Sequence, residues 1–296
     1  MTAALQHLPA GSDDAQRLAV TLGIAAHAIA VHRFPDSELR VTVAPATETT
    51  ILYAPLDQPN DKLVTLILAA EALRRGGARR LVLVAPYLCY MRQDTAFAPG
   101  QAISQKAICA LLARLVDRVV TVDAHLHRTA RIGDVFPGIE ADNLSAMPAI
   151  ADALRGTVDP QTVVVGPDAE SRAWVTALAG LLQLDSTVGH KHRHGDQSVD
   201  IAFEAAERLR GRPALLVDDI VSSGATLTAC AKILRTCGAA RIDAMITHAL
   251  FPPELLVHFS QAGIESVRST TSVPHPTNAI RLDDVLAQAL RWEVHP

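Results

Sequence analysis

The feature that most constrains the fold of this chain is the alternation of short apolar runs with amphipathic segments. The runs are rich in Val, Ile and Leu, and they stand at 81–85, 118–123, 163–166, 214–217 and 242–247. Between them, apolar residues recur at helical spacing. This alternation is typical of parallel sheets flanked by helices, so we expect an α/β protein.

Four helices follow from the spacing of the intervening apolar residues. We expect helices over 63–73, 103–115, 174–182 and 226–236. Asn60 is a candidate N-cap for the first, and Gly76 and Gly77 are candidates to end it. Gly238 is expected to end the last.

The sheet pattern restarts between residues 141 and 160, which places the best domain boundary there. We therefore expect an N-terminal domain over 1–145 and a C-terminal domain over 146–296. Each half contains an apolar strand that runs into an acid, at Asp123 in the first and at Asp218 in the second. This suggests two similar halves, although their internal identity is too weak to prove a duplication.

Composition excludes several classes of protein. Of the 296 residues, 49% are hydrophobic and 20% are charged, which fits a well-buried globular chain. The net charge of −4 and the 4% aromatic content disfavour a nucleic-acid binder. The four cysteines have no zinc-type spacing, and we find no signal peptide or membrane-spanning run. We expect a soluble cytoplasmic protein.

The segment from Leu215 to Thr226 carries the strongest chemical signal. An apolar strand ends in Asp218 and Asp219, and a run of small residues then leads into a helix: Ser222, Ser223, Gly224, Ala225 and Thr226. Unobstructed backbone N–H groups and hydroxyls at a helix N-terminus favour a phosphate dianion. The acids would repel phosphate but suit sugar hydroxyls or a cation-bridged diphosphate. A plain strand-to-helix turn, with Asp218 or Asp219 as cap, is the alternative.

The segment from Gly189 to Gly195 is the second informative one. In an extended strand, Lys191 and Arg193 share one face, and the three histidines at 190, 192 and 194 share the other. Two fixed cations on one face can neutralise charge on a transferred diphosphoryl group. A histidine metal cluster and a solvated loop remain alternatives, and residues 195–197 suggest a mobile tip.

The 215–226 segment resembles the phosphoribosyl-diphosphate loop of type I phosphoribosyltransferases and of ribose-phosphate diphosphokinases. The second family has further motifs in the same order, and this chain contains similar ones. Residues 34–39 resemble its F-P-D-G-E segment, 86–94 resemble P-Y-x-x-Y-x-R-Q-D, and 122–125 resemble M-D-L-H. Residues 142–144 match D-N-L, 166–168 resemble S-P-D, and 247–248 match T-H.

This resemblance implies two tandem phosphoribosyltransferase-like domains, each a mostly parallel sheet flanked by helices. It implies transfer of the diphosphoryl group of ATP to the carbon-1 hydroxyl of ribose 5-phosphate with Mg²⁺, giving 5-phosphoribosyl 1-diphosphate and AMP. It also implies a homo-oligomer, a dimer or higher, with the nucleotide site near a subunit interface.

The resemblance implies a role for each matching residue. The catalytic residues would be Lys191 and Arg193, and the metal ligands His125 and Asp168. The ATP-binding residues would be Phe34, Asp36, Ser37, Glu38, Arg92, Gln93 and Asp94. The ribose 5-phosphate would be held by Asp218, Asp219, Ser222, Ser223, Gly224, Ala225 and Thr226.

Residue chemistry leaves alternatives open at several of these positions. The segment at Phe34 could be a surface loop, and Arg92 could pair with a local acid such as Asp94. His125 is an unusual direct ligand for Mg²⁺, which prefers oxygen, and a lone histidine is by default a core or capping residue. His127 is closer still to that default.

The chain also departs from the family pattern at a few positions. Ser222 stands where many members have an acid, Ala225 replaces a glycine, Ser37 replaces a glycine, and Glu170 follows the S-P-D-like motif. These departures suggest a divergent branch. They keep open a catalytically weak regulatory homologue of a diphosphokinase, and a phosphoribosyltransferase is the other alternative.

Overall fold

The computed structural model describes residues 3–126, 128–194 and 198–294, and at 190–194 and 198–202 it describes the backbone alone. The chain forms two compact units. Unit 1 comprises residues 1–145, 272–274 and 282–296, and unit 2 comprises residues 146–271 and 275–281. The last helix thus belongs to unit 1, so the units are not the two consecutive segments 1–145 and 146–296.

Unit 1 is built on a sheet of six parallel strands within the described residues. Their order is β2 (Ala26–Ala28), β1 (Ala3–His7), β5 (Thr49–Tyr53), β6 (Arg80–Ala85), β7 (Arg118–Val122) and β8 (Glu140–Leu144). The central strands are buried after their first residues, because helices cover both faces of the sheet.

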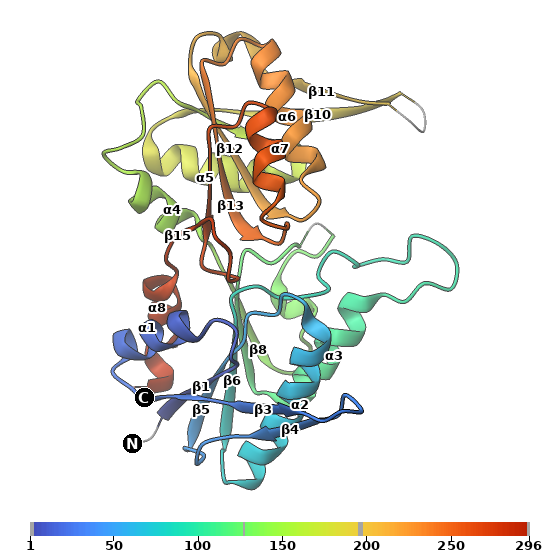
Figure 1. Cartoon of the computed structure of the whole chain (residues 1–296), viewed down its shortest axis with the longest axis vertical. Coiled ribbons are helices and arrows are strands. Elements are labelled where there is room, and N and C mark those ends of the chain that lie inside the picture. Colours follow the sequence, from blue (N-terminus) through green and yellow to red (C-terminus); the bar gives the residue numbers. More distant parts are fainter. Residues whose placement is uncertain (1–2, 127, 195–197, 295–296) are drawn as a thin grey trace. The chain divides into compact units, whose positions relative to one another are not determined.

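The helices of unit 1 form two layers around this sheet (Figure 1). Helices α1 (Ser12–Leu22) and α8 (Asp283–Val294) pack together, and α2 (Pro59–Arg75) packs with α3 (Ser104–Leu115). Helix α2 begins after Gln58, so the expectation that Asn60 caps it is wrong; Asn60 Oδ1 instead accepts a hydrogen bond from the Tyr90 hydroxyl at 2.6 Å. A separate antiparallel hairpin joins β3 (Ala30–Arg33) to β4 (Leu39–Thr42).

A buried ion-pair cluster fixes α8 to the beginnings of β6 and β7. The Glu293 carboxylate accepts hydrogen bonds from Arg80 at 2.7 and 2.8 Å and from Arg118 at 2.9 Å. Burial by itself raises the pKa of Glu293, but the hydrogen bonds from the two arginines outweigh burial, and the pKa is lowered. Glu293 is therefore an ionised anchor for the C-terminal helix.

Unit 2 has a seven-stranded sheet in its described part. The order is β11 (Ser198–Phe203), β10 (Asp185–His194), β9 (Val163–Gly166), β12 (Pro213–Val221), β13 (Arg241–Ala249), β14 (Ser266–Thr270) and β15 (Asn278–Ile280). Only the β10–β11 pair is antiparallel in this part, and β10 and β11 extend as a two-stranded ladder beyond the helices of unit 2 (Figure 1).

Helices of unit 2 also flank its sheet. Helices α4 (Met147–Leu154) and α5 (Arg172–Leu182) pack together, as do α6 (Ala225–Thr236) and α7 (Leu255–Gln261). Short 3-10 turns, η1 (Ile132–Asp134) in unit 1 and η2 (Ala169–Ser171) and η3 (Ala206–Leu209) in unit 2, complete the described elements. Each unit is therefore a mostly parallel sheet between helices, which confirms the predicted α/β class.

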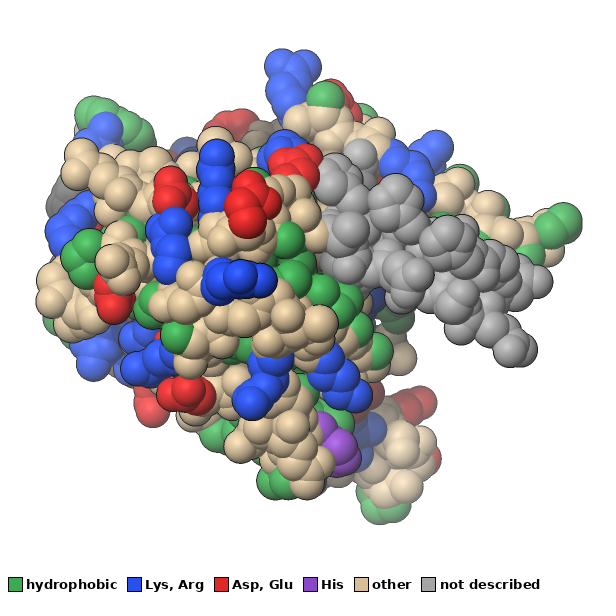
Figure 2. Space-filling model, turned by 90° about the horizontal axis from the view of Figure 1, so that it is seen from above, with side chains coloured by type: hydrophobic (Ala, Val, Ile, Leu, Met, Phe, Trp, Pro, Cys, Tyr) green, Lys and Arg blue, Asp and Glu red, His purple; other side chains and the backbone are tan. Residues whose placement is uncertain are grey.

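The charges on the surface and the lengths of the helices bear on two expectations from the composition. On the face shown in Figure 2, basic side chains are interspersed with acidic and apolar ones, and no broad basic area appears there. In the part of the chain that the structure describes, no helix has the length and apolar character needed to cross a bilayer.

Candidate active site

Strand β12 carries two adjacent carboxylates to its carboxyl end. The strand does not stop at Val217 as expected: Asp218 pairs with Ile246, and the ladder to β13 continues to Val221. Asp219 is buried and Asp218 is half-buried. In open α/β sheets, ligands bind at the carboxyl ends of the strands, so these acids lie where a ligand is expected.

The residues after β12 form a tight, open turn into helix α6. Gly224 is the N-cap residue, with a φ of 72°, and no side chain caps this helix in the described structure. Ser223 is exposed, and its hydroxyl accepts from the Ala225 N–H at 3.5 Å. The first-turn N–H groups of a helix lack intrahelical acceptors and favour an anion. Because Asp218 and Asp219 lie within β12, the alternative in which one of them caps the helix is wrong.

Three carboxylates of unit 2 act on one another. The pKa of Asp218 is raised well above its usual value, first by burial and then by the negative charges of Asp219 and Asp168. Backbone N–H groups partly compensate: Asp219 donates to Asp218 Oδ1 at 3.1 Å, and Ile220 donates to Asp219 Oδ1 at 2.8 Å. A cation between these oxygens would relieve the repulsion, and carboxylate oxygens are the donors that Mg²⁺ prefers.

Asp168 follows β9, within unit 2. Its Oδ1 accepts from the Glu170 N–H at 3.2 Å, and its carbonyl oxygen accepts from the Ser171 hydroxyl at 2.6 Å. Gly166 makes this turn possible, because a Cβ atom there would lie 2.1 Å from Ser171 Oγ. Glu170 itself is exposed.

His125 follows β7, within unit 1, and is half-buried. The two residues before it are held by β8: Asp123 donates its N–H to the Leu144 carbonyl at 2.8 Å, and Ala124 donates to Asn143 Oδ1 at 2.8 Å. The 142–144 motif thus fixes the backbone that leads to His125. His127 lies outside the described residues.

No ready-made metal centre is present among the described residues, where no group of three or more His, Cys, Asp and Glu side chains is arranged to hold an ion. The donor chemistry at Asp168, Asp218 and Asp219 nevertheless fits Mg²⁺. The assignment of His125 and Asp168 as metal ligands stays a prediction.

The predicted nucleotide-contacting residues Phe34, Asp36, Ser37 and Glu38 occupy the tip of the β3–β4 hairpin. Ser37 has a φ of 74°, and the turn is closed by the Phe34 N–H donating to the Glu38 carbonyl at 2.9 Å. Asp36 Oδ1 accepts from the Glu38 N–H at 3.2 Å. Phe34 is 37% exposed, with the Arg40 guanidinium 5.8 Å from its ring centre. The His32 ring also meets the Phe34 ring edge-on, with 4.8 Å between ring centres, so only the exposed part of the Phe34 ring is available to stack on a base.

Arg92, Gln93 and Asp94 lie in the bend after β6. Tyr90 has a φ of 61°, and the side chain of Gln93 accepts from the Ser104 hydroxyl at 3.2 Å. Asp94 pairs with Arg128 at 2.7 Å. Sequence reasoning missed Arg128, since nothing in the sequence signals a partner 34 residues away.

Lys191 and Arg193 lie on β10, which confirms the extended backbone predicted for this segment. Lys191 pairs in register with Ile201, and Arg193 with Val199. The side chains of residues 190–194, including the three histidines of the alternative metal cluster, lie outside the described residues, as do residues 195–197. The catalytic roles of Lys191 and Arg193 stay predictions.

Two mostly parallel sheets flanked by helices define the class of phosphoribosyltransferase-like α/β proteins, and in unit 2 an acidic strand end is followed by a helix without a side-chain cap. Family comparison agrees in both halves. Residues 6–115 match the N-terminal domain of ribose phosphate pyrophosphokinase, and residues 141–252 match the phosphoribosyl transferase domain.

Individual relatives are similar over nearly the whole chain. A ribose-phosphate pyrophosphokinase of Methanopyrus kandleri is 30% identical, over 93% of this chain and 94% of its own. One of Thermococcus kodakarensis is 30% identical, over 86% of this chain and 89% of its own. The crystal structure of a phosphoribosylpyrophosphate synthetase from Mycobacterium smegmatis has the same fold, with a TM-score of 0.85, 23% identity and coverage of 100% and 99% of the two chains. The chain belongs to the ribose-phosphate pyrophosphokinase family.

Proposed function

We propose that this protein transfers the diphosphoryl group of ATP to the carbon-1 hydroxyl of ribose 5-phosphate, giving 5-phosphoribosyl 1-diphosphate and AMP. The proposal rests mainly on one arrangement in unit 2. The paired acids Asp218 and Asp219 lie near the end of β12, and the short turn after this strand leads to the N-terminus of α6, which has no side-chain cap. Membership of the family, whose named relatives are pyrophosphokinases, supports it.

The sugar would bind at this turn. The backbone N–H groups of residues 222–226 and the hydroxyls of Ser222, Ser223 and Thr226 would donate hydrogen bonds to the 5-phosphate. The carboxylates of Asp218 and Asp219 would accept hydrogen bonds from the ribose hydroxyls and so orient the sugar. The acids and the phosphate would stay apart, since Asp218 and Asp219 lie within β12 and the phosphate would bind at the turn that follows this strand.

The nucleotide would be held by residues of unit 1, near a subunit interface in a homo-oligomer of two or more chains. Phe34 would stack on the base, and Asp36 and Glu38 would accept hydrogen bonds from the adenine amino group, with Ser37 between them. Arg92, with Gln93 and Asp94, would bind the phosphates, because a guanidinium grips phosphate oxygens with two parallel hydrogen bonds. Lys191 and Arg193 would neutralise charge on the transferred group.

Magnesium would supply charge neutralisation on the phosphates when bound. Its proposed ligands are Asp168 in unit 2, with Asp218 and Asp219 as further oxygen donors of the same unit, and His125 in unit 1. We expect the reaction to take place in the cytoplasm.

One assay separates this proposal from its alternatives. The purified protein is incubated with ATP, Mg²⁺ and ribose 5-phosphate, and the products are resolved by anion-exchange chromatography. Equal amounts of AMP and 5-phosphoribosyl 1-diphosphate are expected. If no AMP forms across several nucleotides and metals, the diphosphokinase function is wrong, and a regulatory homologue gains support if the same protein alters the rate of an active diphosphokinase. A phosphoribosyltransferase would instead consume 5-phosphoribosyl 1-diphosphate in the presence of a nitrogenous base.

A further inference from the structure

The turn that connects β12 to α6, residues 222–224, is held on both sides by other parts of unit 2. Before the turn, the Val221 carbonyl oxygen accepts a hydrogen bond from the Leu250 N–H at 2.9 Å. At its last residue, Gly224 lies against the Phe259 ring of α7, so closely that a Cβ atom on Gly224 would come 2.5 Å from the ring. The shape of the turn therefore depends on where Leu250 and Phe259 are held.

Phe251 connects these two supports. It is the residue after Leu250, it is 2% exposed, and its ring meets the Phe259 ring edge-on, with 5.1 Å between ring centres. A displacement of Phe251 reaches the turn by two routes, through the backbone to Val221 and through the rings to Gly224. Closely packed interiors transmit such displacements, because they contain little free volume.

His275 holds both the carbonyl group and the ring of Phe251. Its Nε2 lies 3.1 Å from the Phe251 carbonyl oxygen, and its ring centre lies 4.4 Å from that of Phe251. Nδ1 accepts a hydrogen bond from the Thr277 N–H at 3.2 Å, so the proton of the neutral ring is on Nε2, which donates it to Phe251. Burial lowers the pKa of His275 despite this hydrogen bond, which favours the neutral ring at pH 7.

The position of His275 is itself fixed by β14. Its backbone N–H donates to Asn278 Oδ1 at 2.9 Å. The Asn278 amide nitrogen donates in turn to the Thr270 carbonyl oxygen at 2.6 Å and to Ser269 Oγ at 3.0 Å, and both acceptors belong to β14. His275 is therefore anchored to the sheet of unit 2 and is a fixed support for Phe251.

We propose that His275 is a positioning residue for the turn that binds the sugar phosphate. It acts through Phe251, whose carbonyl group and ring it holds in place, so that the N–H groups of residues 222–226 stay directed at the phosphate. The part of this inference that concerns ribose 5-phosphate rests on the proposed function, whereas the part that concerns the shape of the turn does not.

Two measurements test these two parts. Hydrogen–deuterium exchange without ligand follows the first amides of α6, where the Thr228 N–H donates to the Gly224 carbonyl. Isothermal titration calorimetry gives the affinity for ribose 5-phosphate. His275→Ala is expected to speed exchange at residues 225–230 severalfold and to weaken ribose 5-phosphate binding by about fivefold, the effect of losing one hydrogen bond. The affinity for ATP, which unit 1 residues would hold, should stay the same.

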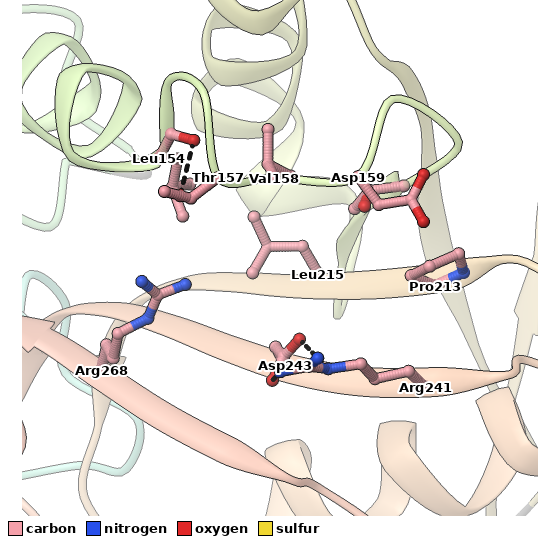
Figure 3. Close-up of a pocket in the computed structure, with 10 residues that line it drawn as sticks. Leu154, Thr157, Val158, Asp159, Pro213, Leu215, Arg241, Asp243 and Arg268 are labelled. Atoms are coloured by element: carbon pink, nitrogen blue, oxygen red, sulfur yellow. Dashed lines mark hydrogen bonds and ion pairs between the residues drawn. The ribbon is translucent and has the colours of Figure 1, made fainter.

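Two controls separate positioning from a general loss of stability. Leu215 lies near the amino end of β12, where it lines a small pocket together with Leu154 and Val158 (Figure 3). Leu215→Ala truncates a buried side chain far from the turn, so it should lower the melting temperature but leave the affinity for ribose 5-phosphate unchanged. His258→Ala, at an exposed position of α7, should change neither.

A double-mutant cycle tests the route through the rings. Since His275 acts through Phe259, His275→Ala should have a smaller effect on the affinity in a Phe259→Leu background than in the unmodified protein. If His275→Ala does not fold, His275→Gln takes its place. It keeps a donor for the Phe251 carbonyl but lacks the ring, and it should weaken ribose 5-phosphate binding by about twofold.

Three results would each overturn the proposal: exchange and affinity in the His275 variants equal to those of the unmodified protein, a loss of affinity in Leu215→Ala as large as theirs, or effects that multiply with Phe259→Leu. So would a failure of the unmodified protein to bind ribose 5-phosphate. Binding that weakens in His275→Ala, in a protein that forms no AMP, would refute the proposed reaction and support the positioning role.

Discussion

Gly224 and Phe259 approach so closely that a Cβ atom on Gly224 would lie 2.5 Å from Cε1 of the Phe259 ring. Gly224 also has a φ of 72°, which a side chain disfavours. The turn into α6 thus requires glycine for two independent reasons, and the ring of α7 supports the turn from behind.

Gly224→Ala is therefore expected to lower the free energy of unfolding by about 2–4 kcal/mol, from left-handed backbone strain and displacement of the ring. It should also weaken binding of ribose 5-phosphate. Chemical denaturation and calorimetry check the two effects. The matched control is Gly180→Ala in α5, where a Cβ atom would meet nothing within 4 Å, and which should stabilise by up to about 1 kcal/mol. Equal stability of the two variants would contradict the role of Phe259.

The raised pKa of Asp218 predicts how stability depends on pH and Mg²⁺. A carboxyl whose pKa is higher in the folded than in the unfolded protein favours folding while protonated, so its contribution is complete below about pH 4 and is lost as pH rises through the raised pKa. Mg²⁺ should offset this loss near neutral pH.

Asp218→Asn removes one of the mutually repelling charges and should raise the melting temperature without Mg²⁺ by roughly 2–4 °C, the shift that about 1 kcal/mol produces in a domain of this size. It should also abolish the further rise that Mg²⁺ produces in the unmodified protein. Differential scanning calorimetry with and without Mg²⁺ measures both. A destabilised Asp218→Asn protein would show that the carboxylate has a favourable partner.

Lys191→Ala is expected to lower kcat by about a hundredfold with little change in KM, because a cation that acts on transition-state charge contributes mainly to rate. Steady-state kinetics of AMP formation measures this split. Lys106→Ala, at an exposed position of α3, is the control. Unchanged turnover in Lys191→Ala would remove this lysine from the mechanism.

Glu293→Gln is expected to destabilise the protein by about 1.5–3 kcal/mol, because Arg80 and Arg118 lose the buried carboxylate that they share and, in the described structure, keep only the more exposed Glu140 and Asp142 as ion-pair partners. Since the pKa of Glu293 is lowered, its contribution is present above about pH 4 and is lost as pH falls further. Urea titrations at pH 7 and pH 3 should differ for the unmodified protein more than for the variant. Glu71→Gln, whose pair with Arg75 is fully exposed to solvent, should leave the free energy of unfolding nearly unchanged.

Thiol reactivity is expected to follow burial. Burial raises the pKa of Cys89 and of Cys109 to about 12, and Cys230 is fully buried. The native protein should therefore react slowly with a thiol reagent at pH 8, first at half-buried Cys237, and at all four cysteines after unfolding. Mass spectrometry of the labelled peptides identifies the order, and rapid native labelling of Cys89 would contradict the buried assignment.

The sequence predicted those helices and strands whose pattern lies within their own residues. The apolar run at 163–166 coincides with β9, and the helix predicted at 226–236 differs from α6 by one residue. The continuation of β12 through Asp218 and Asp219 was missed, because charged residues do not signal a strand and the neighbouring β13 is what supplies their backbone partners. The prediction that Asn60 caps a helix was wrong for a similar reason, because the Asn60 side chain accepts a hydrogen bond from Tyr90, which is distant in sequence.

In the candidate site, too, local features could be predicted from the sequence, and features that depend on contacts between distant residues could not. The turn at 222–226 could be recognised from its residues, since its backbone would form most of the proposed binding surface. The closeness of Asp168 to Asp218 could not be derived from spacing, because it depends on two parallel strands lying side by side. Phe259 carried no signal, since its importance arises only from contact with a glycine in another element.

The placement of α8 has a consequence for biosynthesis. A ribosome releases Arg80 and Arg118 long before it reaches Glu293, with all of unit 2 translated in between. Until then, among the described residues, Arg80 and Arg118 pair only with Glu140 and Asp142 of β8, which are more exposed than Glu293. The first half of the nascent protein therefore becomes fully stable only once the last turn of the C-terminal helix has formed.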